Sequence, residues 1–160
     1  MVQIDDTKLT KRPLVSLVLF VLLVVGGGIA IGASNLPGGW YAGLTKPWFN
    51  PPNWIFAPAW TVLYVLIAIA GWRTFQRNPA GRAMLIWWAQ LAFNFSWSPV
   101  FFRAHLILAA LSVIAVMFVL IIAFIAVQWR RDRVSALLFV PYAMWVGFAS
   151  SLNTAIYFLN

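Results

Sequence analysis

Apolar residues in this chain are gathered into five blocks that contain no charged residue, with short polar segments between them. The blocks are 18 to 26 residues long, and a helix needs about 20 apolar residues to cross the hydrocarbon core of a bilayer. They are Leu14–Ile31, Trp54–Trp72, Ala83–Phe102, Leu106–Trp129 and Val134–Leu159. The pattern predicts an all-α membrane protein, a bundle of five transmembrane helices with bounds near 13–34, 54–76, 81–102, 105–129 and 133–159.

Membrane-spanning strands fit these blocks poorly. A strand would show about 10 residues of alternating polarity, and Leu106–Val127 shows no alternation. A helix also satisfies its own backbone hydrogen bonds, as lipid requires. Because only a polar tail (1–12), one long loop (35–53) and short turns lie outside the helices, we expect a single transmembrane domain over 13–160.

Composition and charge support a membrane location and predict an orientation. The chain is 63% hydrophobic and 9% charged, whereas a soluble domain carries about 25% charged residues. Nine of the eleven basic residues fall in the N-terminal tail and in the second and fourth connections, and only Lys46 and Arg103 fall on the other side. This asymmetry predicts a cytoplasmic N-terminus and a C-terminus outside. The net charge of +8 is therefore assigned to membrane topology and not to nucleic acid binding.

The first apolar block has two interpretations. It follows a basic segment, as the core of a signal peptide would, but its 18 residues exceed the usual 7–15 of such a core. A retained helix is the preferred interpretation. Gly28 and Gly32 form a GxxxG pair that lets another helix approach closely, either from the same chain or from a second copy.

Groups for ordinary catalysis are scarce. The three acids, Asp5, Asp6 and Asp132, lie outside the apolar blocks, and the chain has no cysteine. The single histidine, His105, has no partners for a metal site and is interpreted as an interfacial residue. We therefore expect no metal site, no obligatory cofactor and no hydrolytic or group-transfer enzyme.

The third block carries neutral polar groups at helical spacing. Trp87, Gln90, Asn94 and Trp97 are spaced by three, four and three residues, which puts them on one face of a helix. A buried amide needs a partner, since leaving it bare costs roughly 2–7 kcal/mol. This face is therefore expected to point inward, toward other helices or a bound molecule.

Two other blocks add aromatic and amide groups. Trp60 and Tyr64 are four residues apart in the second block, and Trp145, Ala149 and Asn153 are spaced by four in the fifth. One interpretation is helix packing with amides bonded between helices. The other is a pocket for a flat apolar ligand with one or two polar contacts. The tryptophans near block ends are better interpreted as interfacial belt residues; they are Trp54, Trp72, Trp88 and Trp129.

The loop 35–53 has its own chemistry. It contains four prolines and three glycines as well as Trp40, Tyr41, Trp48 and Phe49. Prolines keep the preceding residues out of helical geometry, so the loop is expected to be mostly non-helical. Its aromatics indicate either interfacial anchors or a lid over a cavity between the helices.

Several motifs in order resemble the translocator protein (TspO) family, also called tryptophan-rich sensory proteins or peripheral-type benzodiazepine receptors. The first is W-Y-A-G-L-T-K-P-W-F-N-P-P-N-W at Trp40–Trp54. It is followed by A-W-T-V-L-Y at Ala59–Tyr64 and Q-L-A-F-N-F-S-W-S-P-V-F-F at Gln90–Phe102. V-P-Y-A-M-W at Val140–Trp145 and S-L-N at Ser151–Asn153 complete the set.

The resemblance implies a five-helix bundle, commonly a homodimer, that binds porphyrins, haem, cholesterol and benzodiazepine-type drugs. It implies that Trp60, Asn94 and Trp145 contact the ligand and that Ala149 lines the wall, while Trp40 and Trp48 close over it. The vertebrate cholesterol motif is missing, because no basic residue follows Leu152. Together with the residues singled out by their helical spacing, these give the full set of expected ligand-binding residues: Trp40, Trp48, Trp60, Tyr64, Gln90, Asn94, Trp97, Tyr142, Trp145, Ala149 and Asn153.

Three functional hypotheses follow. The leading one is a stress-sensing receptor or translocator for porphyrin or haem in a bacterial cell membrane. The second is light-dependent breakdown of protoporphyrin, for which the resemblance implies roles for Trp60 and Trp145. The third is passive transport of porphyrin or sterol-like molecules. Membrane lipid is the other expected partner.

Overall fold

Every regular element that the structure describes is a helix. The computed structural model describes residues 6–160, with side chains from Pro13 onward. Two π-helical segments, Leu22–Gly26 and Pro99–Arg103, follow α1 and α5, and a 3-10 turn, Asn53–Ile55, leads into α4. The α-helices are α1 (Asp6–Val21), α2 (Gly27–Ser34), α3 (Gly39–Gly43), α4 (Phe56–Arg77), α5 (Arg82–Ser98), α6 (Ile107–Gln128) and α7 (Arg133–Leu159).

Four helical segments are long and apolar enough to cross a membrane. They are Pro13–Ser34, Asn53–Arg77, Ile107–Gln128 and Arg133–Leu159. The prediction of an all-helical membrane protein is thus confirmed, while the count of five spans is not. The expected fifth span corresponds to α5, which has 17 residues and whose amides and indoles lower its hydropathy.

The observed helices differ from the expected bounds mainly at two places. The first helix begins at Asp6, inside the segment expected to be a polar tail, and residues 1–5 of that tail lie outside the described part. The loop 35–53 contains the short helix α3, which was not expected. The five residues of α3 lie between Pro37 and Pro47 and none of them directly precedes a proline, so the restriction imposed by proline does not reach them.

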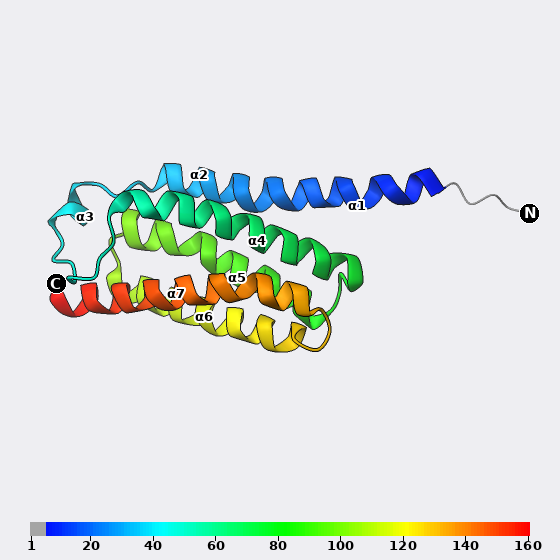
Figure 1. The fold of residues 1–160 in the computed structure, drawn as a ribbon. Coiled ribbons are helices and arrows are strands. Elements are labelled where there is room, and N and C mark those ends of the chain that lie inside the picture. The colour runs from blue at the N-terminus through cyan, green and yellow to red at the C-terminus, as the bar shows by residue number, and fades with distance from the viewer. Residues whose placement is uncertain (1–5) are drawn as a thin grey trace, which may run out of the picture.

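The long helices form one bundle. Each of α4, α5, α6 and α7 contacts its neighbours in a ring, while α1 lies along the outside of α4 and α2 contacts α5 (Figure 1). The buried face of α6 shows the three- and four-residue spacing of an amphipathic helix. Its residues are Ala110, Ile114, Met117, Ile121 and Phe124.

Glycines allow the closest helix contacts. The fully buried indole of Trp87 lies against Gly71, where a Cβ would sit 2.2 Å from the ring, and its Nε1 donates to the carbonyl of Ile67 at 3.0 Å. At Gly28 a Cβ would lie 2.1 Å from the ring of Tyr64, whereas Gly32 has nothing within 4 Å. The close neighbour expected at the GxxxG pair is therefore α4 of the same chain, at Gly28.

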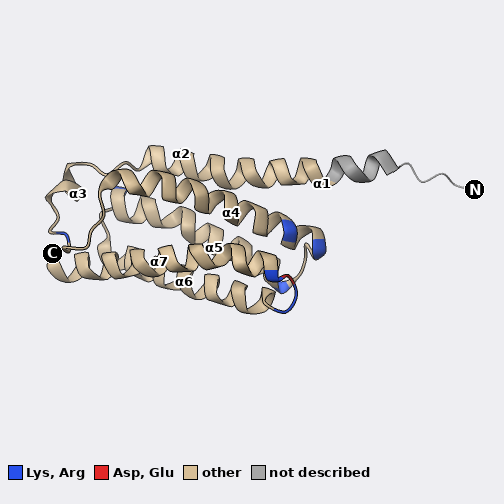
Figure 2. Ribbon diagram, viewed as in Figure 1, with Lys and Arg blue, Asp and Glu red and all other residues tan. Residues whose placement is uncertain are grey.

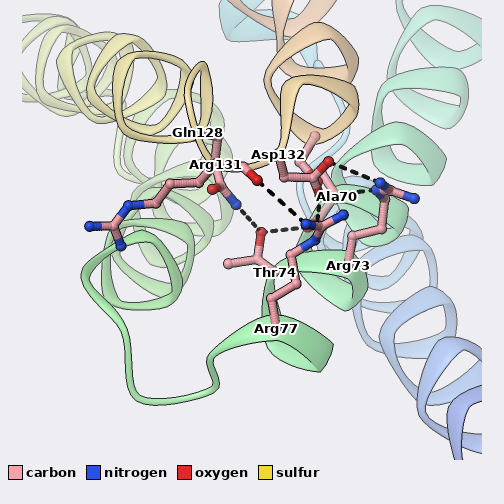
Figure 3. A network of polar contacts seen from close by, with 8 residues as sticks. Ala70, Arg73, Thr74, Arg77, Gln128, Arg131 and Asp132 are labelled. Atoms are coloured by element: carbon pink, nitrogen blue, oxygen red, sulfur yellow. Dashed lines mark hydrogen bonds and ion pairs between the residues drawn. The ribbon is translucent and has the colours of Figure 1, made fainter.

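Basic residues gather at the end of the bundle where α4 ends and α7 begins (Figure 2). Asp132, in the α6–α7 turn, accepts hydrogen bonds from Nε and Nη2 of Arg73 at 3.1 and 2.9 Å and pairs with Nε of Arg77 at 3.1 Å (Figure 3). Ser135 donates to the same carboxylate at 2.6 Å. Burial by itself raises the pKa of Asp132, but the hydrogen bonds from Arg73 and Ser135 and the two positive charges outweigh it and lower the pKa to about 2.

Candidate functional site

A hydrogen-bonded group of four side chains lies in the interior of the bundle, and we call it the polar centre: Tyr64, Gln90, Asn94 and Tyr142. The hydroxyl of Tyr142 accepts from Nδ2 of Asn94 at 2.7 Å and donates to Oε1 of Gln90 at 3.0 Å. Tyr64 donates to Oδ1 of Asn94 at 3.3 Å. These bonds join α4, α5 and α7 through neutral groups.

The polar centre is buried but not fully paired. Gln90 and Tyr142 have no exposed surface, and Asn94 is 5% exposed. Nε2 of Gln90 is buried without a hydrogen-bond partner. Leaving such a donor unpaired costs about 1–3 kcal/mol, so this amide is a group that a bound acceptor would satisfy.

An aromatic wall adjoins the polar centre, and we define it by Trp60, Phe56, Trp145 and Phe148. The ring of Trp60 lies 5.3 Å from Tyr64 and meets the ring of Tyr142 edge-on at 6.3 Å. Trp145 packs against Phe56 at 5.8 Å and Phe148 at 5.9 Å, and its Nε1 is buried without a partner. The wall therefore offers flat apolar surface and one more donor.

A second polar contact lies farther along α5 and α7, toward the loop. Nε1 of Trp97 donates to Oδ1 of Asn153 at 3.2 Å, and Nδ2 of Asn153 donates to the carbonyl of Ile107 at 3.3 Å. Trp97 also stacks on Phe101 at 5.1 Å. These two expected site residues are thus paired with each other and separate from the polar centre.

The loop lies at the same end of the bundle as the C-terminus (Figure 1). Trp40 stacks on His105 at 4.1 Å and meets Phe101 edge-on, while Tyr41 is buried against Phe101 and Phe102. The backbone of Thr45 exchanges two hydrogen bonds with the side chain of Asn160, at 2.9 and 3.0 Å. The loop is thereby attached to both the α5–α6 corner and the end of α7.

The structure brings together some expected site residues and leaves others apart. Trp60, Tyr64, Gln90, Asn94, Tyr142 and Trp145 form the polar centre and its wall, and half-buried Ala149 packs against the same core. Trp40 contacts the α5–α6 corner instead, and Trp48 is 96% exposed. Closure of these two loop indoles over a ligand stays a prediction.

Sequence reasoning missed three contributors to the site. Sδ of Met117, on α6, lies 3.3 Å from the Tyr142 hydroxyl, and Phe56 and Phe148 complete the wall. All three resemble any other apolar residue in a span, so no local signal marks them. Gly28 supports Tyr64 from behind, and its GxxxG spacing was the one available signal.

Fold and site together define a class: a multi-pass helical membrane protein whose interior holds a tyrosine–amide network flanked by indoles. Residues 18–159 match the TspO/MBR family. The chain belongs to the TspO/MBR family.

Relatives from distant organisms agree with this assignment. The chain is 41% identical over 138 residues to the tryptophan-rich sensory protein of Cereibacter sphaeroides, covering 86% of this chain and 87% of that protein. It is 41% identical over 150 residues to the tryptophan-rich protein TspO of Archaeoglobus fulgidus, covering 92% and 96%. It is 33% identical over 146 residues to the translocator protein of Sus scrofa, covering 86% of each. The family consists of membrane sensory and translocator proteins.

Proposed function

We propose that this protein is a membrane receptor for a tetrapyrrole, either a porphyrin or haem, bound between α4, α5 and α7. The main support is the pair of buried donors without partners, Nε2 of Gln90 and Nε1 of Trp145, beside the aromatic wall. A porphyrin is flat and apolar over its macrocycle and carries acceptor atoms, so it matches both features. The tryptophan-rich sensory relative supports a sensing role.

The proposal includes α5 as a fifth span. The π-helical segment Pro99–Arg103 extends the 17 residues of α5, and the amides that lower its hydropathy, Gln90 and Asn94, are buried inside the bundle. With five spans, the basic end in Figure 2 faces the cytoplasm and the loop lies outside, as the positive-inside rule requires. We therefore propose that the protein lies in a bacterial cell membrane. A homodimer is also proposed, and light scattering of the purified protein would test it.

Titration with protoporphyrin tests the binding site. Trp145→Phe removes a donor and part of the wall, and we expect it to weaken binding about two- to twelvefold, because one hydrogen bond contributes about 0.5–1.5 kcal/mol. The readout is the shift of the porphyrin Soret band in detergent solution. The matched control is Trp129→Phe, since Trp129 is 44% exposed at the opposite end of the bundle and contacts Arg133.

The outcome separates this site from general partition of porphyrin into the micelle. If Trp145→Phe and Trp129→Phe bind equally, the wall is not the binding surface and the receptor assignment fails. Uptake into sealed vesicles distinguishes a receptor from a transporter, because a receptor binds porphyrin without accumulating it in the lumen. Illumination of the complex under oxygen tests the alternative of porphyrin breakdown.

A further inference from the structure

A shallow depression lies at the basic end of the bundle, on the far side from the loop. Trp72, Arg73, Gln76 and Arg77 line it, all from the last two turns of α4. Trp72 is fixed against α1, because its Nε1 donates to the carbonyl of Pro13 at 3.0 Å and lies 3.1 Å from Oγ of Ser16. The segment of α1 at Pro13 and Ser16 therefore lies beside Trp72, next to the depression.

The two guanidinium groups of the depression are held in place but keep donors available. Asp132 engages Nε and Nη2 of Arg73 and Nε of Arg77, and Nη1 of Arg77 reaches the carbonyl of Arg131 at 3.4 Å (Figure 3). Among the side chains that the structure describes, none accepts from Nη1 of Arg73 or Nη2 of Arg77. Both side chains are accessible, with 27% and 53% of their surface exposed. Donors in this fork geometry suit the oxygens of a phosphate.

Charge at this end is far from balanced. Six arginines lie near the ends of α4 to α7, and within the described side chains Asp132 is the one acid among them (Figure 2). Asp132 is 4% exposed, and its single negative charge is paired with the two positive charges of Arg73 and Arg77, so the depression keeps a net positive charge. The surface arginines are Arg73, Arg77, Arg82, Arg130, Arg131 and Arg133.

An apolar strip leads from the depression toward the middle of the bundle. Val65, Ile69, Trp72 and Gln76 are spaced by four, three and four residues and share one face of α4. Val65 is 37% exposed, and Ile69 and Trp72 are half-buried. Exposed Leu137 of α7, 51% accessible, adds apolar surface near the same end. The feature thus pairs a cationic end with an apolar track.

We propose that this depression is a binding site for an anionic phospholipid. The phosphate binds Arg77 and Arg73, with Gln76 beside it, and an acyl chain lies along Trp72, Ile69 and Val65. The apolar strip favours a lipid over free phosphate, since a free anion has no acyl chain to bind along the strip. The site lies at the opposite end from the loop and is separate from the polar centre.

Native mass spectrometry of the detergent-solubilised protein tests this site by counting bound phosphatidylglycerol and phosphatidylcholine. We expect Arg77→Gln to lower the preference for phosphatidylglycerol about tenfold, because a hydrogen bond between charged groups contributes about 1.5 kcal/mol. The matched control is Arg82→Gln, which removes the same charge at the same end but outside the depression. It should change the preference less than twofold, because Arg82 does not line the depression and makes no contact with the bound phosphate.

A second variant separates binding from folding, because Arg77 also pairs with Asp132. Gln76→Glu places a carboxylate beside the two guanidinium groups without removing an ion pair, and it should lower the preference to a similar degree. If Arg77→Gln and Arg82→Gln lower the preference for phosphatidylglycerol equally, the effect comes from the overall positive charge, and the proposed binding site is wrong. If inorganic phosphate displaces the bound lipid as effectively as phosphatidylglycerol does, the depression binds a free anion instead, and the proposal is also overturned.

Discussion

Replacing Gly28 by alanine tests whether the packing of α2 holds Tyr64 in the polar centre. The added Cβ would lie 2.1 Å from the Tyr64 ring, and carbon atoms in contact prefer about 3.5 Å. The ring must therefore move by about 1.4 Å. The hydrogen bond from Tyr64 to Asn94 is already 3.3 Å long, so such a movement breaks it.

Two terms lower the free energy of unfolding of Gly28→Ala, and a third, the helix preference of alanine, raises it. Overpacking costs about 1–3 kcal/mol, and a hydrogen bond between membrane helices contributes about 0.6 kcal/mol. Alanine also favours the helix over glycine by up to about 1 kcal/mol. Gly32→Ala carries the same helix preference one turn away, where nothing lies within 4 Å. Because the helix preference cancels between the two variants, we expect Gly28→Ala to be less stable than Gly32→Ala by the sum of the first two terms, about 1.6–3.6 kcal/mol.

Reversible unfolding of the two variants in mixed micelles, followed by circular dichroism, measures this difference. Protoporphyrin titration should weaken in Gly28→Ala only, because the displaced Tyr64 ring disturbs the polar centre. Equal free energies of unfolding for the two variants would refute the packing described for α2 and α4.

Two further predictions concern groups already described. Tyr142→Phe leaves Oε1 of Gln90 and Nδ2 of Asn94 without their partner, and should lower the free energy of unfolding by about 1–3 kcal/mol; an unchanged value would contradict the buried network. Asp132 has a pKa lowered from 3.8 to about 2 in the folded protein. The ionised carboxylate therefore contributes about 2 kcal/mol to the free energy of unfolding at pH values above the unfolded pKa. That contribution is lost as the pH falls from about 5 toward 2, and Asp132→Asn should flatten this part of the pH–stability curve. Thermal unfolding across that range is the measurement, and a slope that survives in the variant would assign the effect to other acids.

Helix α5 shows how much of the site the sequence could predict. Three- and four-residue spacing depends only on helix geometry, so the inward direction of Trp87, Gln90 and Asn94 was accessible from the chain alone, and all three are buried. The hydrogen bonds of Tyr142 to both amides could not be predicted, because they depend on the register of α7 against α5. The exposed position of Trp48 could not be predicted either, since a loop has no periodicity that fixes the direction of a side chain.

The two bonds between Thr45 and Asn160 have a mechanical consequence for access through the loop end of the bundle. The loop cannot swing freely on its hinges, because it moves together with the final turn of α7. Opening on that side then requires both bonds to break or the end of α7 to move with the loop, which makes it slower than the motion of an untethered loop. If the protein binds a porphyrin as proposed, the easiest entry is from the side, between helices, out of the surrounding lipid.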